Sequence, residues 1–156
     1  MTDPAPGSPM AEHTLTISRV LDAPRELVWK AWTDPTQFAK WFGPEGFRTP
    51  EDSVTIDPRP GGAFRSTMVG PDGTEYPSDG TFREVVEPER LVAGEDAIDS
   101  PMMERTENVL TFTDLGDGRS ELTIEVKMVC TEELLPMAER GWGTTLDKLA
   151  ALLSDR

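Results

Sequence analysis

The sequence is poor in the residues that build disulfides, metal centres and nucleophilic active sites. Its 156 residues include one cysteine, Cys130, and one histidine, His13. A single cysteine cannot form an intrachain disulfide, which favours a reducing cytoplasm as the location. One histidine cannot supply a Cys–His zinc cluster, and a catalytic triad would have to use His13, at the edge of a predicted tail. No metal and no cofactor is therefore predicted.

Basic charge and long apolar runs are also scarce. The chain has 15 Lys and Arg against 29 Asp and Glu, which gives a net charge of -14. Nucleic acids and anionic membrane surfaces would repel such a chain, so neither is expected as a partner. No run reaches the roughly eighteen apolar residues of a membrane span, and the first residues lack the basic and apolar regions of a signal peptide. No membrane insertion is predicted.

The apolar residues that are present come in periodic blocks. They make up 37% of the chain, and no linker or repeat separates them. A chain of this length can bury a core of its own, so residues 13–156 are predicted to form a single domain. Residues 1–12 are rich in Pro, Gly and Ser and are predicted to be a mobile N-terminal tail.

The first third of that domain indicates a strand and two short helices. Residues 14–22 are β-branched and roughly alternate, which is typical of a strand. Pro24 fits the first position of a helix. Asp34 is expected to cap a second helix, which ends before Gly43-Pro44.

The middle of the chain changes to a period of two. Short runs of this kind are separated by turn signals, among them "GPDG" at residues 70–73 and "GDG" at residues 116–118. The second of these is a strong hairpin signal. In the strand after it, every second residue from Leu122 to Met128 is apolar, which predicts an antiparallel sheet covered on one face.

A long amphipathic helix is predicted to close the chain, with a break or a start near Pro136. Its apolar residues recur at steps of three and four as far as Leu153. Trp142 is expected at the centre of the buried stripe and Lys148 on the exposed side. The whole pattern predicts an α+β fold, a curved antiparallel sheet of about seven strands with the long helix in its concave face.

Four blocks of the sequence carry a family resemblance. They are "RVLDAPRELVWKAWTDPTQFAKWFGPEGF", "IDPRPGGAFRSTM", "GPDGTEYPSDGTFREVVEPERLV" and "GWGTTLDKLAALL". They resemble the bacterial proteins related to the activator of the heat-shock-protein-90 ATPase, the AHSA-type members of the START-like (SRPBCC) superfamily. The resemblance runs in order from Thr14 to Leu153. It implies the helix-grip fold of the birch-pollen allergen, with two short helices after the first strand.

The resemblance also implies a cavity between the sheet and the C-terminal helix. Such a cavity would hold a small apolar or aromatic molecule, and the aromatic and methionine side chains are the candidates to line it. Trp32 is expected to be plain core. The predicted lining residues are Trp41, Phe42, Phe64, Met68, Tyr76, Phe82, Met128, Met137 and Trp142.

Two other functions stay open at this point. The first is an enzyme of the cyclase or dehydratase kind that uses a cavity carboxylate, for which Asp79 and Glu84, with Arg65 and Arg83, are the charged candidates. The second is a chaperone-linked protein-interaction module, although the chain has no room for the second domain of the eukaryotic co-chaperones. Non-enzymatic binding is the favoured interpretation, and the sequence leaves a homodimer open.

Overall fold

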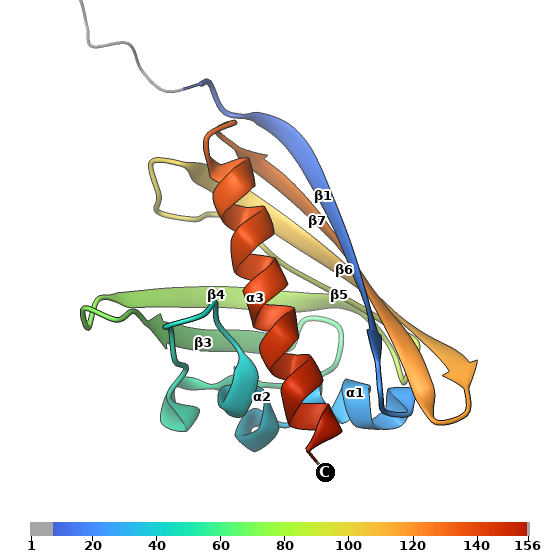
Figure 1. Cartoon of the computed structure of the whole chain (residues 1–156). Coiled ribbons are helices and arrows are strands. Elements are labelled where there is room, and N and C mark those ends of the chain that lie inside the picture. The colour runs from blue at the N-terminus through green and yellow to red at the C-terminus, as the bar shows by residue number, and fades with distance from the viewer. Residues whose placement is uncertain (1–7, 156) are drawn as a thin grey trace, which may run out of the picture.

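The computed structural model describes residues 8–155 of the chain (Figure 1). Three α-helices, one 3-10 helix and seven strands follow one another within these residues. In chain order they are β1 (Ala11–Leu21), α1 (Arg25–Thr33), α2 (Pro35–Trp41), η1 (Glu51–Ser53), β2 (Thr55–Ile56), β3 (Ala63–Val69), β4 (Glu75–Val86), β5 (Arg90–Glu95), β6 (Met103–Gly116), β7 (Arg119–Cys130) and α3 (Leu134–Ser154).

The strands form one antiparallel sheet in the order β1-β7-β6-β5-β4-β3-β2. Figure 1 shows α3 lying across one face of this curved sheet, with α1 and α2 at the end of the sheet near the C-terminus. The predicted α+β helix-grip architecture is confirmed, including the seven strands, the two short helices and the long final helix. No helix among residues 8–155 is apolar over a length that would cross a bilayer.

The predicted boundary of the N-terminal tail is wrong by two residues. β1 begins at Ala11, because Ala11 and Glu12 pair with Cys130 and Val129 and so extend the ladder between β1 and β7. Before the strand, the backbone N–H of Ser8 donates to a carboxylate oxygen of Glu133 at 2.8 Å. Residues 1–7, the rest of the predicted tail, lie outside the described residues.

Local signals in the sequence place the helix starts and the turns. The Asp34 side chain accepts a hydrogen bond from the backbone N–H of Thr36 at 3.0 Å, so Asp34 caps α2 as predicted. Pro24 comes directly before α1 rather than at its first position. In the hairpin between β6 and β7, Asp117 and Gly118 both have positive φ (56° and 74°), as a tight hairpin turn requires.

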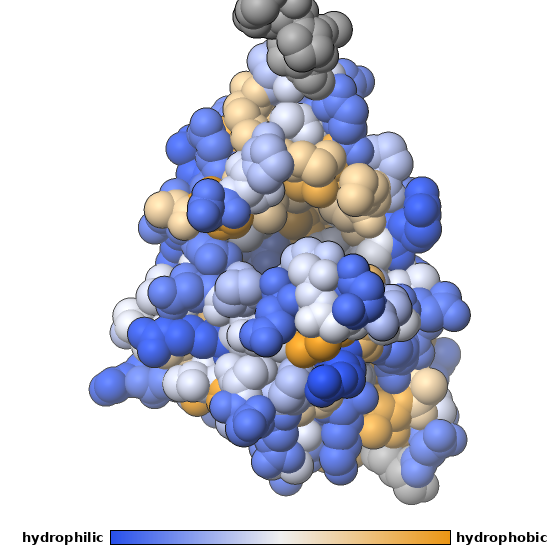
Figure 2. Space-filling view, turned by 90° about the vertical axis from the view of Figure 1, so that its left-hand side faces the viewer, coloured by the Kyte–Doolittle hydropathy of each residue, from blue (hydrophilic) through white to orange (hydrophobic). Residues whose placement is uncertain are grey.

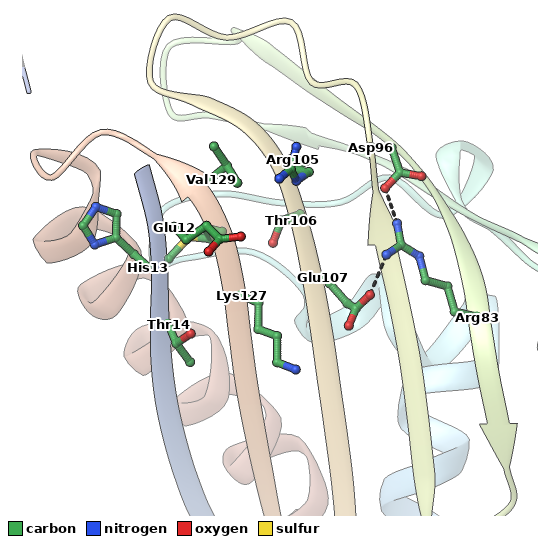
Figure 3. Close-up of a pocket in the computed structure, with 11 residues that line it drawn as sticks. Glu12, His13, Thr14, Arg83, Asp96, Arg105, Thr106, Glu107, Lys127 and Val129 are labelled. Atoms are coloured by element: carbon green, nitrogen blue, oxygen red, sulfur yellow. Dashed lines mark hydrogen bonds and ion pairs between the residues drawn. The ribbon is translucent and has the colours of Figure 1, made fainter. Parts of the chain in front are cut away.

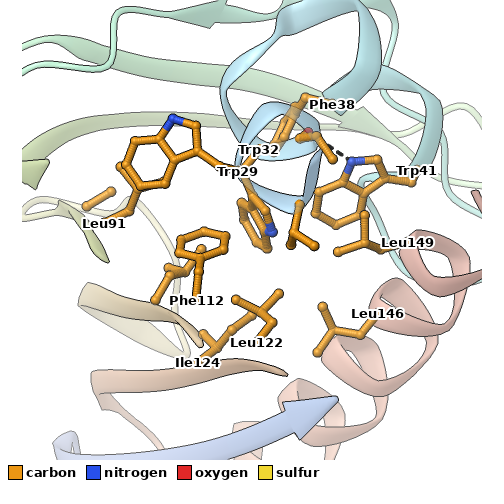
Figure 4. Packing of buried hydrophobic residues seen from close by; sticks show 14 of the residues in the cluster. Trp29, Trp32, Phe38, Trp41, Leu91, Phe112, Leu122, Ile124, Leu146 and Leu149 are labelled. Carbon is orange, nitrogen blue, oxygen red and sulfur yellow. Dashed lines mark hydrogen bonds between the residues drawn. The ribbon is translucent and has the colours of Figure 1, made fainter. Parts of the chain in front are cut away.

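The core lies between the sheet, α1 and the C-terminal half of α3. Figure 4 shows Trp29 and Trp32 of α1 projecting toward Phe112 and Leu122 of the sheet, with Leu149 of α3 on the other side. The rings of Trp29 and Phe112 make an edge-to-face contact with centroids 5.3 Å apart. Trp32 is core, as predicted.

α3 differs from the prediction in how its faces are used. The helix begins at Leu134, so Pro136 lies in its first turn, where a missing N–H costs little. Its buried residues are Thr145, Leu146, Leu149 and Leu153. Trp142 is only half-buried: its ring stacks on Trp32 at the edge of the core, so it does not stand at the centre of the buried stripe. Lys148, expected to be exposed, is half-buried as well.

Candidate functional site

A groove opens between the inner face of the sheet and the N-terminal half of α3. Its volume is about 730 Å³, and its wall is mainly apolar, with Phe42, Met68, Tyr76, Met103, Met128 and Trp142 among the lining residues. Figure 2 shows the side of the molecule that carries the turn between β3 and β4. The surface is hollowed there, and hydrophobic residues gather above the hollow. β4 extends beyond α3, so the helix does not cover its first residues, and residues 75–79 are exposed. This uncovered part of the sheet leaves the groove open.

A small recess of about 70 Å³ continues from the groove toward the core. Phe42 and Trp142 line both spaces, and the recess adds the rings of Trp32, Phe38 and Phe64. These rings pack on one another, with Phe38 and Phe42 stacked at 4.3 Å between centroids. The aromatic segment after β1 therefore closes the inner end of the groove.

Six of the nine predicted lining residues lie on these two spaces. Phe42, Met68, Tyr76, Met128 and Trp142 line the groove, and Phe64 lines the recess. Tyr76 stands at the edge, since it is 45% exposed and its ring packs on Phe47. Whether these residues bind a ligand stays a prediction.

The other three predicted lining residues are not on the groove or the recess. Trp41 is core, 1% exposed, and its indole Nε1 donates to the carbonyl oxygen of Ala31 at 3.1 Å. Phe82 is buried and stacks on Phe64 with centroids 4.9 Å apart. Met137 is 56% exposed on the outer side of α3. Their placement on the cavity wall was wrong, because neighbouring residues of one helix or strand face different surroundings.

The charged candidates for acid–base chemistry form ion pairs at the surface, and of the four only Asp79 also lines the groove. Arg65 and Asp79 form an exposed ion pair at 2.8 Å, and Glu84 pairs with Arg90 at 3.1 Å. Arg83 stands between Asp96 and Glu107 and pairs with both (Figure 3). Each of these arginines is thus matched to a carboxylate at the surface.

The face drawn in Figure 3 carries a smaller groove of about 360 Å³. The chain neighbours of Glu107 and Lys127 line the inner groove. Because side chains alternate between the two faces of a sheet along each strand, Glu107 and Lys127 point to the outer face, and this space lies there. Its lining mixes acidic and basic side chains, and both partners of Arg83 contribute to it. Such a mixed, open surface is suited to water and ions more than to an apolar molecule.

The polar side chains of the inner groove were not among the predicted site residues. Glu95, Thr106 and Asn108 line both the groove and the recess. The alternation of side chains along β5 could have predicted the position of Glu95. Leu91 and Ala93 belong to the core, and Glu95 follows them on the same face of the strand. The Glu95 carboxylate accepts hydrogen bonds from the Asp79 backbone N–H at 3.0 Å and the Ser78 hydroxyl at 3.3 Å.

Metal-ligating groups do not converge in the part of the chain that the structure describes. No three His, Cys, Asp or Glu side chains of these residues come close enough together to hold an ion. Burial raises the pKa of the Cys130 thiol, so this cysteine is an apolar neighbour in the core rather than a reactive thiolate. What the groove offers chemically is an apolar surface with a few hydrogen-bonding groups.

Sequence and structure comparisons identify the family. Residues 22–154 match the family of Activator of Hsp90 ATPase homolog 1-like proteins. The chain belongs to this family. No curated protein matches the chain.

Solved structures agree with this assignment to the Activator of Hsp90 ATPase homolog 1-like family. The chain is 30% identical to a protein from Chromobacterium violaceum, with a TM-score of 0.79 over 90% of this chain and 96% of that chain. It is also 30% identical to a protein from Nitrosomonas europaea, with a TM-score of 0.77 over 91% and 94% of the two chains. The AHSA1 protein from Silicibacter pomeroyi, at 24% identity and a TM-score of 0.77 over 91% and 98%, shares the fold.

Proposed function

We propose that this AHSA1-like protein binds a small apolar or aromatic molecule in the groove between the sheet and α3. The groove itself carries the proposal. Its volume of about 730 Å³ lies within the range of roughly 300–1,000 Å³ that small-molecule sites occupy. An interior without a ligand role would be expected to close on itself, as the core around Leu146 and Leu149 does.

The chemistry of the wall supports the same function. Phe42, Met128 and Trp142 present aromatic and thioether surface, which adapts to apolar molecules of irregular shape. Asn108 and Thr106 add hydrogen-bonding groups at the inner end, and such groups fix a ligand's orientation. Because Cys130 is the single cysteine of the chain, we place this binding in the cytoplasm.

A neutral fluorescent probe tests the proposal. N-phenyl-1-naphthylamine, an apolar aromatic molecule, is expected to bind with one-to-one saturation and to raise the melting temperature. A ligand that binds only the folded state adds about 2.7 kcal/mol at a hundredfold excess over Kd. For a chain of this size that is a shift of about 5–10 °C, because about 1 kcal/mol corresponds to 2–4 °C.

Two variants on α3 locate the binding. Ala138 lines the groove, whereas the preceding residue, Met137, points away from it. Ala138→Phe is therefore expected to weaken probe binding at least tenfold, and Met137→Phe to leave it within twofold. Equal affinities in the two variants would place the probe elsewhere. Absence of saturable binding to the unmodified chain would contradict the proposal.

A further inference from the structure

The charged groups around the groove are of one sign. Among the described residues that line the groove or the recess there are four acids, Glu75, Asp79, Glu95 and Asp99, and no lysine, arginine or histidine. The whole chain adds to this field with its net charge of -14. A carboxylate or phosphate entering the groove would be repelled by the acids that line it, whereas a cation would be attracted.

Glu95 is the acid that belongs to the interior of the groove. It is the last residue of β5, it is half-buried, and it lines both the groove and the recess. Asp79, by contrast, directs its carboxylate to Arg65. Glu75 and Asp99 are exposed at the rim.

No cation of the described chain neutralises Glu95. Its carboxylate accepts hydrogen bonds from Ser78 and from the Asp79 backbone, but no lysine, arginine or histidine within residues 8–155 pairs with it. The nearby acids Asp79 and Asp96 each have an arginine partner. A half-buried carboxylate without a cation is unfavourable unless something else compensates its charge.

Aromatic side chains line the same spaces as this carboxylate. Phe42 and Trp142 line the groove and the recess together with Glu95, and Tyr76 stands at the mouth. Ammonium groups bind to the faces of Trp, Tyr and Phe, and the attraction increases where water is excluded. A carboxylate next to aromatic rings is thus a combination that recognises an organic cation.

We propose that the ligand of the groove is an amine in its positively charged form, with its ammonium group next to Glu95. Its apolar body lies against Phe42, Met128 and Trp142. The side-chain oxygen of Asn108, which accepts from the Thr106 hydroxyl at 3.4 Å, accepts a further hydrogen bond from the ammonium group. This inference rests on the proposed function and names the ligand class of the same site.

Three probes with the same aromatic ring test the charge preference. They are 1-naphthylmethylamine, which is cationic at pH 7, the neutral 1-naphthylmethanol, and the anionic 1-naphthoate. Calorimetric titrations at low salt are expected to show the amine binding at least tenfold more tightly than the alcohol, with the naphthoate weakest. Raising the salt concentration should reduce the difference between amine and alcohol, because salt screens charges.

A pair of variants tests the role of Glu95. Glu95→Gln keeps the shape and a carbonyl oxygen that accepts hydrogen bonds, but removes the charge. It is expected to abolish most of the amine's advantage while leaving the alcohol's Kd within twofold. The matched control is Glu125→Gln, which makes the same change in net charge on β7, where Glu125 pairs with Lys127 and is not one of the residues that line the groove. This control should keep the preference.

The outcomes separate this inference from the proposed function. If the alcohol binds and the amine has no advantage, the charge inference is wrong and the binding function stands. If the preference survives in Glu95→Gln, Glu95 is not the anchor, which also overturns the inference. If none of the three probes binds, both the charge inference and the proposed function are wrong. Melting curves of both variants check that they are folded.

Discussion

Trp32 and Trp41 are neighbours in the core, with ring centroids 4.8 Å apart in an edge-to-face contact. Both are almost completely buried, at 2% and 1% exposed. The two residues differ in the hydrogen bond of the indole N–H. The Nε1 of Trp41 donates to the carbonyl oxygen of Ala31, whereas the Nε1 of Trp32 has no acceptor among the described residues. The pair therefore offers a measurement of a single buried hydrogen bond.

Replacing each tryptophan by phenylalanine removes the N–H and the same volume. Trp41→Phe is expected to cost about 0.5–1.5 kcal/mol more than Trp32→Phe, the usual net contribution of one hydrogen bond. The comparison is made on the free energy of unfolding in urea. Since the loss of volume is common to both variants, it cancels in the difference. Equal losses would show that the bond from Trp41 to Ala31 contributes nothing to stability.

At the scale of elements, α3 is tied to the loop that follows α2. The Lys148 Nζ donates to the carbonyl oxygens of Pro44 and Phe47, at 3.4 Å and 3.3 Å. One turn earlier, Thr144 Oγ1 accepts from the backbone N–H of Glu45 at 3.0 Å. These contacts hold the loop against the same helix that covers the sheet, so they fix where α3 lies relative to α2.

Burial lowers the pKa of the Lys148 ammonium below its ordinary value near 10.5. Between the lowered pKa and 10.5 the unfolded chain binds more protons than the folded one, so this group makes stability rise with pH in that window. Below the lowered pKa its effect does not change with pH.

The test compares the unmodified chain with Lys148→Met in urea melts from pH 7 to pH 10.5. The unmodified chain is expected to gain stability relative to the variant as the pH rises. All other titrating groups are shared by the two proteins and cancel in the difference. A difference that is constant, or that falls with pH, would contradict the lowered pKa.

At the scale of the whole molecule, charge repulsion opposes folding. The net charge of -14 is concentrated when the chain becomes compact. Exposed ion pairs such as Arg65–Asp79 and Arg59–Asp57 offset little of this, since exposed pairs contribute about 0–1 kcal/mol each.

Raising NaCl from about 20 mM to about 200 mM is therefore expected to raise the melting temperature. The Debye length is about 10 Å at 0.1 M, so most of the long-range repulsion is screened over this range. A gain on the order of 1 kcal/mol corresponds to about 2–4 °C for a chain of this size. A lower melting temperature in salt would show that local ion pairs outweigh the repulsion.

The order of helices and strands follows from local features of the sequence. Period two in the strand that ends at Cys130, the Asp34 cap and the turn at Gly116–Gly118 are local features, and all three are in the structure as predicted. These three features and the apolar stripe of the final helix together allow few arrangements of the elements in which every apolar face is buried. The α+β architecture follows from that restriction.

Which of the covered faces meet the open groove depends on how the elements pack together. Trp41 and Phe42 are adjacent in the sequence, but Trp41 turns to the core and Phe42 to the groove. Periodicity tells the covered face of an element from the exposed one. It does not tell how far α3 reaches over β4, or which part of the sheet it leaves uncovered. The exposure of Met137, the half-burial of Lys148 and the place of Glu95 in the groove all depend on that position, because it is set by contacts between elements distant in the sequence.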